Sequence, residues 1–316
     1  MAEGIKNAIM IYNPASGRRR RRRFEEIEKA VAILKGAGIT VEIAATTAPG
    51  TARGLAQLAV GQRRDLVIAC GGDGTVNEVV NGLAGSRVPM ALLPAGTANI
   101  LAKELGVPWD IPQAARLISS ATVRRIALGI ASPPGVNGNG APAHALVGRY
   151  FLCVGGAGPD GAIVNGVDEI FKKNAGILAY WAEGAKQLFR YDFPEMKIRS
   201  GGKERRATIV VVGRTAHYGG PFKITTGASL FEDTFEMLIN SGASRLQYLS
   251  CLPALWMGKL RKVKGIDAWK DTEVVCESAD ERMIFAQVDG EPIGALPLAF
   301  RIVPDALSIL VPAGRA

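Results

Sequence analysis

Apolar runs in the first 130 residues alternate with stretches in which apolar residues recur at helical spacing. The strand-like runs lie at residues 8–13, 39–47, 65–70 and 89–94. Helical spacing occurs at residues 24–34, in a short segment after 47, at 76–83, and from near Thr97 to the residue before Gly106. This rhythm predicts a parallel sheet covered by helices on both faces. We expect the α/β region to end near residue 130.

The pattern changes after residues 131–148, a segment so rich in proline and glycine that it indicates a long loop and a domain boundary. Short, often alternating apolar runs follow, at residues 149–158, 195–200, 205–213, 234–240, 271–278 and 282–291. Helical patterns interrupt them at residues 175–191 and around 252–263. This half therefore predicts a β-sandwich, and the whole chain an α/β plus all-β protein.

Composition fits two ordinary globular domains, because 48% of the 316 residues are apolar and 21% are charged. The four cysteines are scattered and form no CxxC pair, which argues against a zinc site or a disulfide framework. Residues 1–14 lack the pattern of an export signal, and the apolar stretch 246–258 is too short to span a bilayer. We therefore expect a cytoplasmic protein.

Charge is concentrated in one place. Six of the nine excess positive charges lie in the run Arg18–Arg23. Such a patch indicates docking to nucleic acid, an anionic membrane or nucleotide phosphate. Nucleic acid is the weakest of these partners, because the chain has no recognisable nucleic-acid module and the run has no interleaved aromatic residues.

The most informative motif is CGGDGTVNEVVNGL at residues 70–83, where a buried-type strand breaks into a glycine-rich turn and then a helix. Glycines let backbone N–H groups approach an oxyanion, and a helix N-terminus favours negative charge. A tight strand-to-helix connection is the plainer interpretation. Asp73 favours phosphoryl transfer, because a carboxylate beside phosphate needs a divalent cation or a reacting hydroxyl. The spacing matches neither the P-loop nor the dinucleotide fingerprint.

Two companion turns, residues 12–17 and 93–105, also follow predicted strands. All three turns should lie at the carboxyl edge of the sheet, where ligands of open parallel sheets bind. Neutral donors for phosphate or ribose are Asn13, Ser16, Thr97 and Asn99. Helix capping is the alternative role for each of them.

The motifs NPASG, GGDGTVNEVVNGL and LPAGTANILAKELGVP resemble, in order and spacing, the nucleotide-site motifs of the diacylglycerol kinase catalytic-domain family. This family includes sphingosine and ceramide kinases and bacterial YegS-like lipid kinases. The later segments GGAGPDGAIV, GILAYWAEGAKQL, HYGGPFKITTGASL and VDGEPIG extend the resemblance over nearly the whole chain.

The resemblance implies a Rossmann-like nucleotide domain at residues 1–130, completed by 302–316, that binds ATP with Mg²⁺. Residues 131–301 would form a β-sandwich-like lipid-binding domain. The γ-phosphate would pass to a hydroxyl of a membrane lipid, diacylglycerol or a similar lipid alcohol. A soluble NAD kinase, which shares the GGDG turn, and a non-enzymatic membrane or nucleic-acid binder stay as alternatives.

The resemblance also assigns site residues. The nucleotide contacts fall on Asn13, Pro14, Ala15, Ser16, Gly17, Thr47, Gly71, Gly72, Asp73, Gly74, Thr75, Asn77, Gly96, Thr97 and Asn99. Asp73 would organise Mg·ATP, and Asp289 and Glu291 would form the catalytic DGE motif. Glu291 is the favoured base, since a carboxylate within hydrogen-bond reach of an alcohol can take its proton. Taken alone, VDGEP is typical of a tight turn between strands.

A structural metal site of some relatives would fall on Glu232 or Asp233, although the glycine of the relatives' loop is absent here. The partners implied are ATP, a lipid and an anionic membrane surface. The sequence does not decide whether the protein forms a homodimer. Peripheral membrane association follows from these partners.

Three segments are candidates for contact with lipid or phosphate. Residues 246–264 combine leucines and Trp256 with lysines and an arginine, which fits an interfacial helix or a core helix that ends in a solvated basic turn. Tyr180, Trp181 and Leu188 fit an acyl-chain channel or ordinary core. In the arginine run, Arg18 or Arg19 would reach ATP phosphate, while the others would face anionic headgroups or only solvent.

Overall fold

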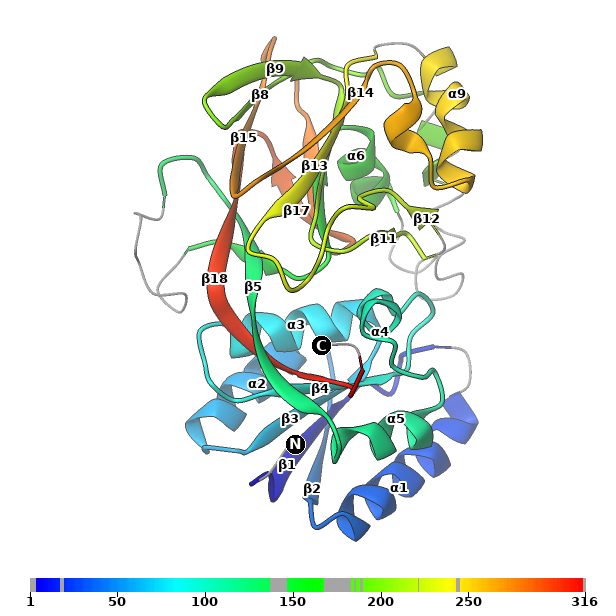
Figure 1. The fold of residues 1–316 in the computed structure, drawn as a ribbon, viewed down its shortest axis with the longest axis vertical. Coiled ribbons are helices and arrows are strands. Elements are labelled where there is room, and N and C mark those ends of the chain that lie inside the picture. Colours follow the sequence, from blue (N-terminus) through cyan, green and yellow to red (C-terminus); the bar gives the residue numbers. More distant parts are fainter. Residues whose placement is uncertain are drawn as a thin grey trace. The chain divides into compact units, whose positions relative to one another are not determined.

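A computed structural model describes residues 4–17, 20–136, 147–167, 183–184, 186–187, 190–220, 222–242 and 245–314. The chain divides into two compact units (Figure 1). The N-terminal unit runs to Leu128 and resumes at Pro304, and the C-terminal unit lies between Gly129 and Val303. Among the described residues, no helix has the length and apolar character needed to cross a bilayer.

The N-terminal unit is built on a parallel sheet in the order β2-β1-β3-β4, followed by the end of β18. Its strands are β1 (Asn7–Tyr12), β2 (Thr40–Ala45), β3 (Leu66–Gly71), β4 (Met90–Pro94) and the last part of β18 (Leu298–Val311). Strand β18 joins beside β4, where Ile309 pairs with Met90. The strands β3 and β4 are buried along their whole length, as expected for apolar strands covered on both faces.

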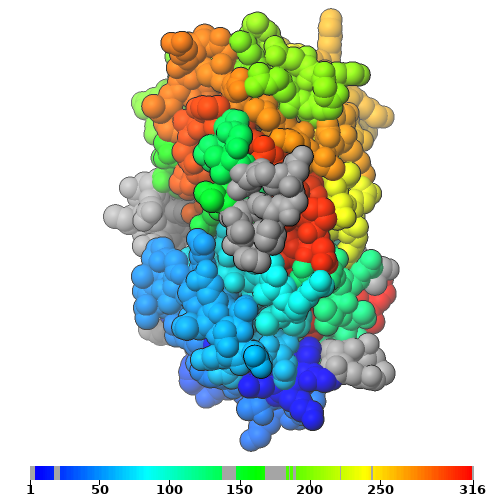
Figure 2. All heavy atoms as spheres, turned by 90° about the vertical axis from the view of Figure 1, so that its left-hand side faces the viewer, coloured from blue at the N-terminus to red at the C-terminus, as the bar shows by residue number. Residues whose placement is uncertain are grey.

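Five helices cover this sheet: α1 (Arg20–Gly36), α2 (Thr51–Gly61), α3 (Asp73–Leu83), α4 (Ile100–Leu105) and α5 (Ile111–Ile118). They pack as two main pairs, α1 with α5 and α2 with α3. Figure 2 views the side that α2 covers, where its medium-blue side chains form much of the surface of this unit. The α/β fold expected from the hydrophobic pattern is therefore confirmed.

The C-terminal unit contains a six-stranded antiparallel sheet in the order β14-β13-β10-β7-β16-β17. Its strands are β14 (Ile266–Asp271), β13 (Phe235–Asn240), β10 (Ile209–Gly213), β7 (Val154–Ala157), β16 (Phe285–Val288) and β17 (Glu291–Ala295). A second group begins with the first part of β18 and continues in the order β15 (Glu273–Ser278), β8 (Met196–Ser200) and β9 (Lys203–Ala207). Strand β5 (Thr122–Ser132), most of which belongs to the N-terminal unit, pairs with β18 and, through residues 129–131, with β6 (Arg149–Phe151). A small hairpin joins β11 (His217–Tyr218) and β12 (Phe222–Lys223).

One hydrophobic core joins the two groups of strands in this unit. Phe151 stacks on Phe235 with ring centroids 5.6 Å apart, and the ring of Phe300 meets Phe151 edge-on at 6.1 Å. Such pairs combine burial of large apolar area with a favoured ring geometry. The expected β-rich second half is therefore confirmed.

Several elements differ from the sequence-based expectation. Helix α4 begins at Ile100 instead of near Thr97, because Asn99 takes a left-handed conformation with φ 48°. The sequence did not indicate helix α6 (Pro159–Gly166) or strand β14, whose residues are only half-buried. Helix α9 (Arg245–Trp256) ends earlier than expected and is followed by the 3₁₀ helix η2 (Leu260–Lys262). The predicted helix at 175–191 lies largely outside the described residues.

Candidate active site

The turns after β1 and β3 are joined directly by side-chain hydrogen bonds. The Asn13 amide donates to the Thr75 hydroxyl at 3.1 Å, and the Gly72 N–H donates to the Ser16 hydroxyl at 3.3 Å. Parallel strands end at one edge of their sheet, so side chains from residues far apart in sequence meet there. The structure thus brings together these four residues of the predicted nucleotide site.

Asp73 joins the turn after β3 to the turn after β4. It is the first residue of α3, and its carboxylate accepts the N–H of Asn99 at 3.0 Å and that of Ile100 at 2.7 Å. These N–H groups belong to the start of α4, where no helical carbonyl can accept them. Asp73 therefore acts as the cap of α4 as well as the acidic residue of the GGDG turn.

The backbones of the two turns approach so closely that they require glycine. A Cβ added to Gly96 would lie 2.4 Å from the Cα of Gly72, and one added to Gly17 would lie 2.4 Å from the carbonyl oxygen of Ala95. Gly17 also has φ 70°, a conformation that favours glycine. The glycines of all three motifs thus serve one packed cluster of turns.

The other predicted nucleotide residues divide by exposure. Asn99 is buried and its amide oxygen accepts the N–H of Gly96 at 3.0 Å, so it shapes the turn. Asn77 is also buried and accepts a hydrogen bond from the Asn81 amide inside α3. Residues exposed at or near this edge are Pro14, Ala15, Thr47 and Thr97, while Gly71 is buried and Gly74 is half-buried.

Two cations near this edge, Lys103 and Arg23, were not among the nucleotide contacts predicted from the sequence. Lys103 in α4 is partly buried, and burial lowers the pKa of its ammonium while the charge of Asp73 opposes that shift. Arg23 is only 7% exposed and donates to the carbonyl oxygen of Ala95 at 3.2 Å. Both side chains reach the site from neighbouring helices, so only the folded chain places them there.

The arginine run is therefore not uniform. Arg22 is exposed, whereas Arg23 points inward, so Arg23 does not face a membrane or solvent as the other arginines of the run could. Arg18 and Arg19 lie outside the described residues. Burial raises the pKa of the neighbouring Cys70 thiol to about 12, and the positive charge of Arg23 opposes this shift.

The DGE motif forms the two-residue turn between β16 and β17. Asp289 and Gly290 both have positive φ, 49° and 79°, while Val288 and Glu291 pair across the hairpin. Two consecutive positive φ values are typical of the turns that match the twist of a hairpin, and aspartate followed by glycine favours them. The turn predicted from VDGEP is therefore present.

Asp289 and Glu291 have different surroundings in this turn. The Asp289 carboxylate accepts three backbone N–H groups, from Leu152 at 2.8 Å and from Cys153 and Val154 at 2.9 Å. It therefore fastens the hairpin to the segment between β6 and β7. Glu291 is half-buried at the start of β17.

An open, mainly apolar pocket of about 200 Å³ lies in the C-terminal unit. Its described lining comes from α6, β10, β11, α9 and the segments between them, and includes Ile163, Phe193, Val211 and Tyr248. The lining also contains Asp160, which accepts a hydrogen bond from the Gln287 amide at 2.7 Å. Burial raises the pKa of Asp160 to about 6. Tyr180, Trp181 and Leu188, for which the sequence left an acyl-chain channel and ordinary core as alternatives, lie outside the described residues.

A connected pair of hydrogen bonds links this pocket to the DGE turn. The Gln287 amide that donates to Asp160 also accepts the N–H of Gly290 at 2.8 Å through its oxygen. Gln287 is 1% exposed, so neither bond competes strongly with water. Gln287 thus joins the pocket wall to the turn that carries Glu291.

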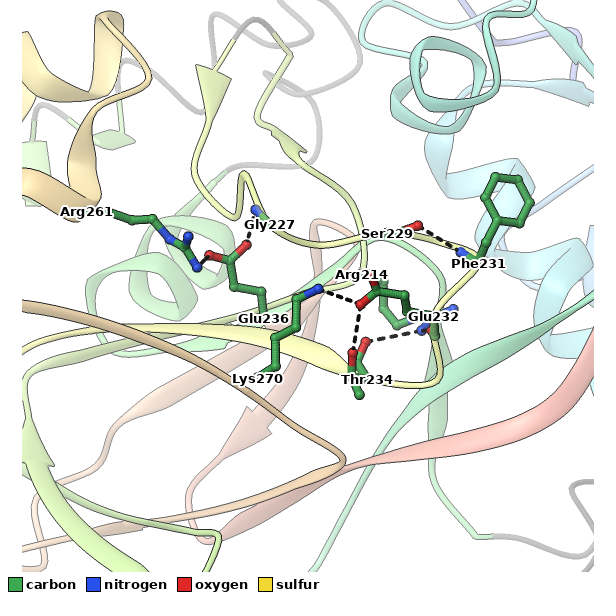
Figure 3. A network of polar contacts seen from close by, with 9 residues as sticks. All are labelled: Arg214, Gly227, Ser229, Phe231, Glu232, Thr234, Glu236, Arg261 and Lys270. Carbon is green, nitrogen blue, oxygen red and sulfur yellow. Dashed lines mark hydrogen bonds and ion pairs between the residues drawn. The ribbon is translucent and has the colours of Figure 1, made fainter. Parts of the chain in front are cut away.

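The predicted metal loop, residues 230–234, folds around the side chain of Arg214, which directly follows β10 (Figure 3). The fully buried Arg214 guanidinium donates to the carbonyl oxygens of Leu230, Glu232 and Thr234. The Glu232 carboxylate accepts from Lys270 and from the Thr234 hydroxyl.

Two positively charged side chains of this protein, Arg214 and Lys270, thus bind oxygen atoms of the loop. In the described part of the chain, no group of three or more His, Cys, Asp or Glu side chains is placed to hold a metal ion. In this structure the Glu232 carboxylate pairs with Lys270, and the metal role of Glu232 and Asp233 stays a prediction of the family resemblance alone.

Sequence comparisons agree with this architecture. Residues 7–131 match the family described as the diacylglycerol kinase catalytic domain, and residues 154–311 match the YegS C-terminal NAD kinase beta sandwich-like domain. A diacylglycerol kinase of Bacillus subtilis strain 168 is 29% identical over 99% of this chain and 98% of its own length. One from Staphylococcus aureus strain bovine RF122 / ET3-1 is 27% identical over 97% of this chain and 93% of its own length.

Solved structures show the same fold. The crystal structure of a diacylglycerol kinase from Bacillus anthracis strain Sterne has a TM-score of 0.72 at 21% identity and covers 99% of both chains. Another solved chain from this strain reaches a TM-score of 0.77 at 23% identity, covering 98% of this chain and 97% of its own.

The fold and the two matched domains define a kinase of the lipid-phosphorylating class. The chain belongs to the YegS-like lipid kinase family, and it is an ATP-dependent lipid kinase. The NAD kinase alternative is not favoured, because the catalytic-domain match and the similar curated proteins are diacylglycerol kinases.

Proposed function

We propose that the enzyme transfers the γ-phosphate of ATP to the hydroxyl of diacylglycerol, yielding phosphatidic acid and ADP. The observation that carries this proposal is the cluster of three turns at the carboxyl edge of the parallel sheet, in a chain that aligns end to end with diacylglycerol kinases. The names of those relatives supply the choice of diacylglycerol among lipid alcohols.

The phosphates of ATP are proposed to bind at the turn after β3. The N-terminus of the eleven-residue helix α3 directs backbone N–H groups and a favourable dipole toward this edge. The glycine contact lets the backbones of the turns after β3 and β4 pack directly against each other beside this helix N-terminus. Asn13 and Ser16 hold the first turn against this surface.

The oxygen ligands at this edge suit Mg²⁺, which prefers carboxylate, hydroxyl and phosphate oxygens. Asp73 would supply the carboxylate, and the hydroxyls of Ser16 and Thr75 lie in the same cluster of turns. A bound Mg²⁺ would neutralise charge on the transferring phosphoryl group.

Glu291 is proposed as the base. The Asp289 carboxylate already accepts three backbone N–H groups, so its main contribution is to fix the turn. Glu291 would take the proton of the lipid hydroxyl while the hydroxyl oxygen forms a bond to the γ-phosphorus of ATP. The bond between the γ-phosphorus and the bridging oxygen of the β-phosphate would break at the same time, and ADP would leave.

The apolar pocket of the C-terminal unit is proposed to hold part of one acyl chain. Its lining by Ile163, Phe193 and Val211 suits a hydrocarbon. Its volume of about 200 Å³ is below the range of about 300–1,000 Å³ for complete small-molecule sites, so part of the lipid would stay outside. This arrangement implies that the enzyme works at a membrane surface as a peripheral protein.

The test is an assay with labelled ATP, Mg²⁺ and diacylglycerol in mixed micelles, followed by mass spectrometry of the lipid product. We expect labelled phosphatidic acid, its loss on chelation and its return on addition of Mg²⁺. If a different lipid alcohol is labelled and diacylglycerol is not, that lipid is the substrate and the choice of diacylglycerol is wrong. Transfer to NAD and to no lipid would refute the proposal.

A further inference from the structure

Helix α9 is apolar on the side that packs and also on the side that does not. Its inner side places Cys251 against Leu238 and Leu260, with Ala254 and Leu255 partly buried beside them. An α-helix that is apolar all round is normally buried on all sides. In this helix, however, the outer side is open.

The open side of α9 carries large apolar side chains: Leu246 (78% exposed), Leu249 (39%), Leu252 (46%) and Trp256 (68%), with Met257 (60%) directly after the helix. We call these five residues the α9 patch. Thirteen large apolar side chains are exposed among the described residues, and five of them lie within residues 246–257. Exposed apolar residues scattered singly are ordinary, but a contiguous group indicates a binding surface.

The charge around the α9 patch has one sign. Residues 245–265 contain five basic residues and no acidic one. Arg245, Lys259, Lys262 and Lys264 are exposed, and Arg261 pairs with the buried Glu236. An apolar face bordered by lysines fits the boundary between acyl chains and anionic headgroups.

Helix α9 carries the α9 patch on its outer side and forms part of the wall of the apolar pocket on its inner side. Tyr248, on the inner side of α9, lines the pocket together with Ile224, and its hydroxyl lies 2.7 Å from that of Thr208. At the other end of the helix, the ring of Trp256 packs edge-on against Phe222 of β12, with centroids 5.4 Å apart. One side of α9 thus forms pocket wall, and the other forms the exposed surface.

We propose that α9 is the membrane-docking helix: its α9 patch enters the interface of an anionic bilayer and Lys259, Lys262 and Lys264 contact the headgroups. A lipid leaving the bilayer would then pass along α9 into the pocket beside Tyr248. The second step rests on the proposed function, whereas binding to the bilayer does not. Docking by insertion of single side chains fits the length of α9, which is twelve residues.

The experiment measures binding of the full chain to phosphatidylcholine vesicles with and without phosphatidylglycerol. The test variant is Leu249→Gln/Leu252→Gln/Trp256→Gln. The matched control is Leu58→Gln/Val123→Gln/Met283→Gln, which changes three apolar residues elsewhere that are at least as exposed on average. We expect the test variant to bind anionic vesicles at least about tenfold more weakly and the control to bind as the wild type does.

A second variant separates charge from apolar insertion. Lys259→Gln/Lys262→Gln/Lys264→Gln should weaken binding to anionic vesicles by about tenfold or more, and the loss should shrink as salt is raised. Trp256 reports insertion directly, because its fluorescence should shift to shorter wavelength on vesicles. The shift should be absent in Trp256→Phe, which keeps the other three tryptophans.

Activity separates this proposal from the proposed function. The ratio of the rate on vesicles to the rate on a monomeric short-chain diacylglycerol should fall in the test variant and stay constant in the control. If the wild type phosphorylates no lipid at all, the proposed function is refuted, and vesicle binding still tests the docking proposal. Equal vesicle binding by test variant and wild type overturns the docking proposal, as does a wild-type dimer that the test variant converts to monomer.

Discussion

The carboxylate of Asp73 accepts the backbone N–H of Asn99 at 3.0 Å, across 26 positions of sequence. The bond joins the turn after β3 to the turn after β4, and the Ile100 N–H reinforces it at 2.7 Å. The residue that the resemblance assigns to Mg·ATP thus also determines the shape of the turn that would face the nucleotide.

The two roles of Asp73 can be separated by two substitutions. Asp73→Asn keeps one of the two oxygen acceptors that cap α4, so we expect a stability loss of about 1 kcal/mol but a loss of kcat of at least about 100-fold. Asp73→Ala removes the cap and should also cost about 1–2 kcal/mol of stability. Urea unfolding and lipid kinase assays measure the two effects. Full activity in Asp73→Asn would show that the carboxylate acts only as a cap.

The close approach of Gly72 and Gly96 predicts that Gly96→Ala disrupts the nucleotide site. The added Cβ would lie 2.4 Å from the Gly72 Cα, so the two turns must separate. We expect about 1–3 kcal/mol of destabilisation and a raised KM for ATP. Gly54→Ala in α2 is the control, because no atom lies within 4 Å of its Cβ position and alanine favours a helix. Equal ATP KM values in the two variants would contradict the prediction.

The DGE turn predicts opposite effects for its two acidic residues. Asp289→Ala leaves three backbone N–H groups without their acceptor and should cost about 2–4 kcal/mol of folding stability. Glu291→Gln should lower kcat by about 100-fold or more with the unfolding midpoint unchanged. A stable, inactive Asp289→Ala beside an active Glu291→Gln would reverse the assignment of the base.

The contacts of Arg214 predict a loop whose stability does not depend on metal. Arg214→Lys cannot reach all three carbonyl oxygens and should cost about 2–4 kcal/mol, while a chelator should leave wild-type unfolding unchanged. The control Arg206→Lys alters an exposed ion pair with Glu195 and should cost less than about 1 kcal/mol. A chelator that lowers the unfolding midpoint would contradict this account.

Burial of Asp160 predicts a pH-dependent penalty. Burial raises its pKa to about 6 in the fold from the ordinary aspartate value of 3.8, so the folded chain holds its proton more tightly than the unfolded chain does. The stability of the wild type should therefore fall relative to that of Asp160→Asn as the pH rises from about 4 to about 6, by about 3 kcal/mol. Urea unfolding of both proteins across this range measures the difference, and a constant difference would contradict the raised pKa.

Local patterns in the sequence were sufficient for most of the N-terminal unit. The strands β1, β3 and β4 are continuous apolar runs, and the turns after them contain glycine and capping residues, so each element and the carboxyl edge were predictable. The C-terminal unit was less predictable. Strand β14 is only half-buried, and α6 begins with Pro159 and contains two glycines, so neither shows a strong period.

The sequence by itself determined which residues form the three glycine turns and the DGE turn, because glycine, aspartate and proline constrain the backbone locally. Only the tertiary structure decided what those turns contact: Asp73 with the start of α4, Arg23 with Ala95, Asp160 with Gln287, and Arg214 with the loop at 230–234. Each of these contacts joins segments from 16 to 127 residues apart. These contacts depend on how the whole unit packs, and the local spacing of hydrophobic residues carries no information about that packing.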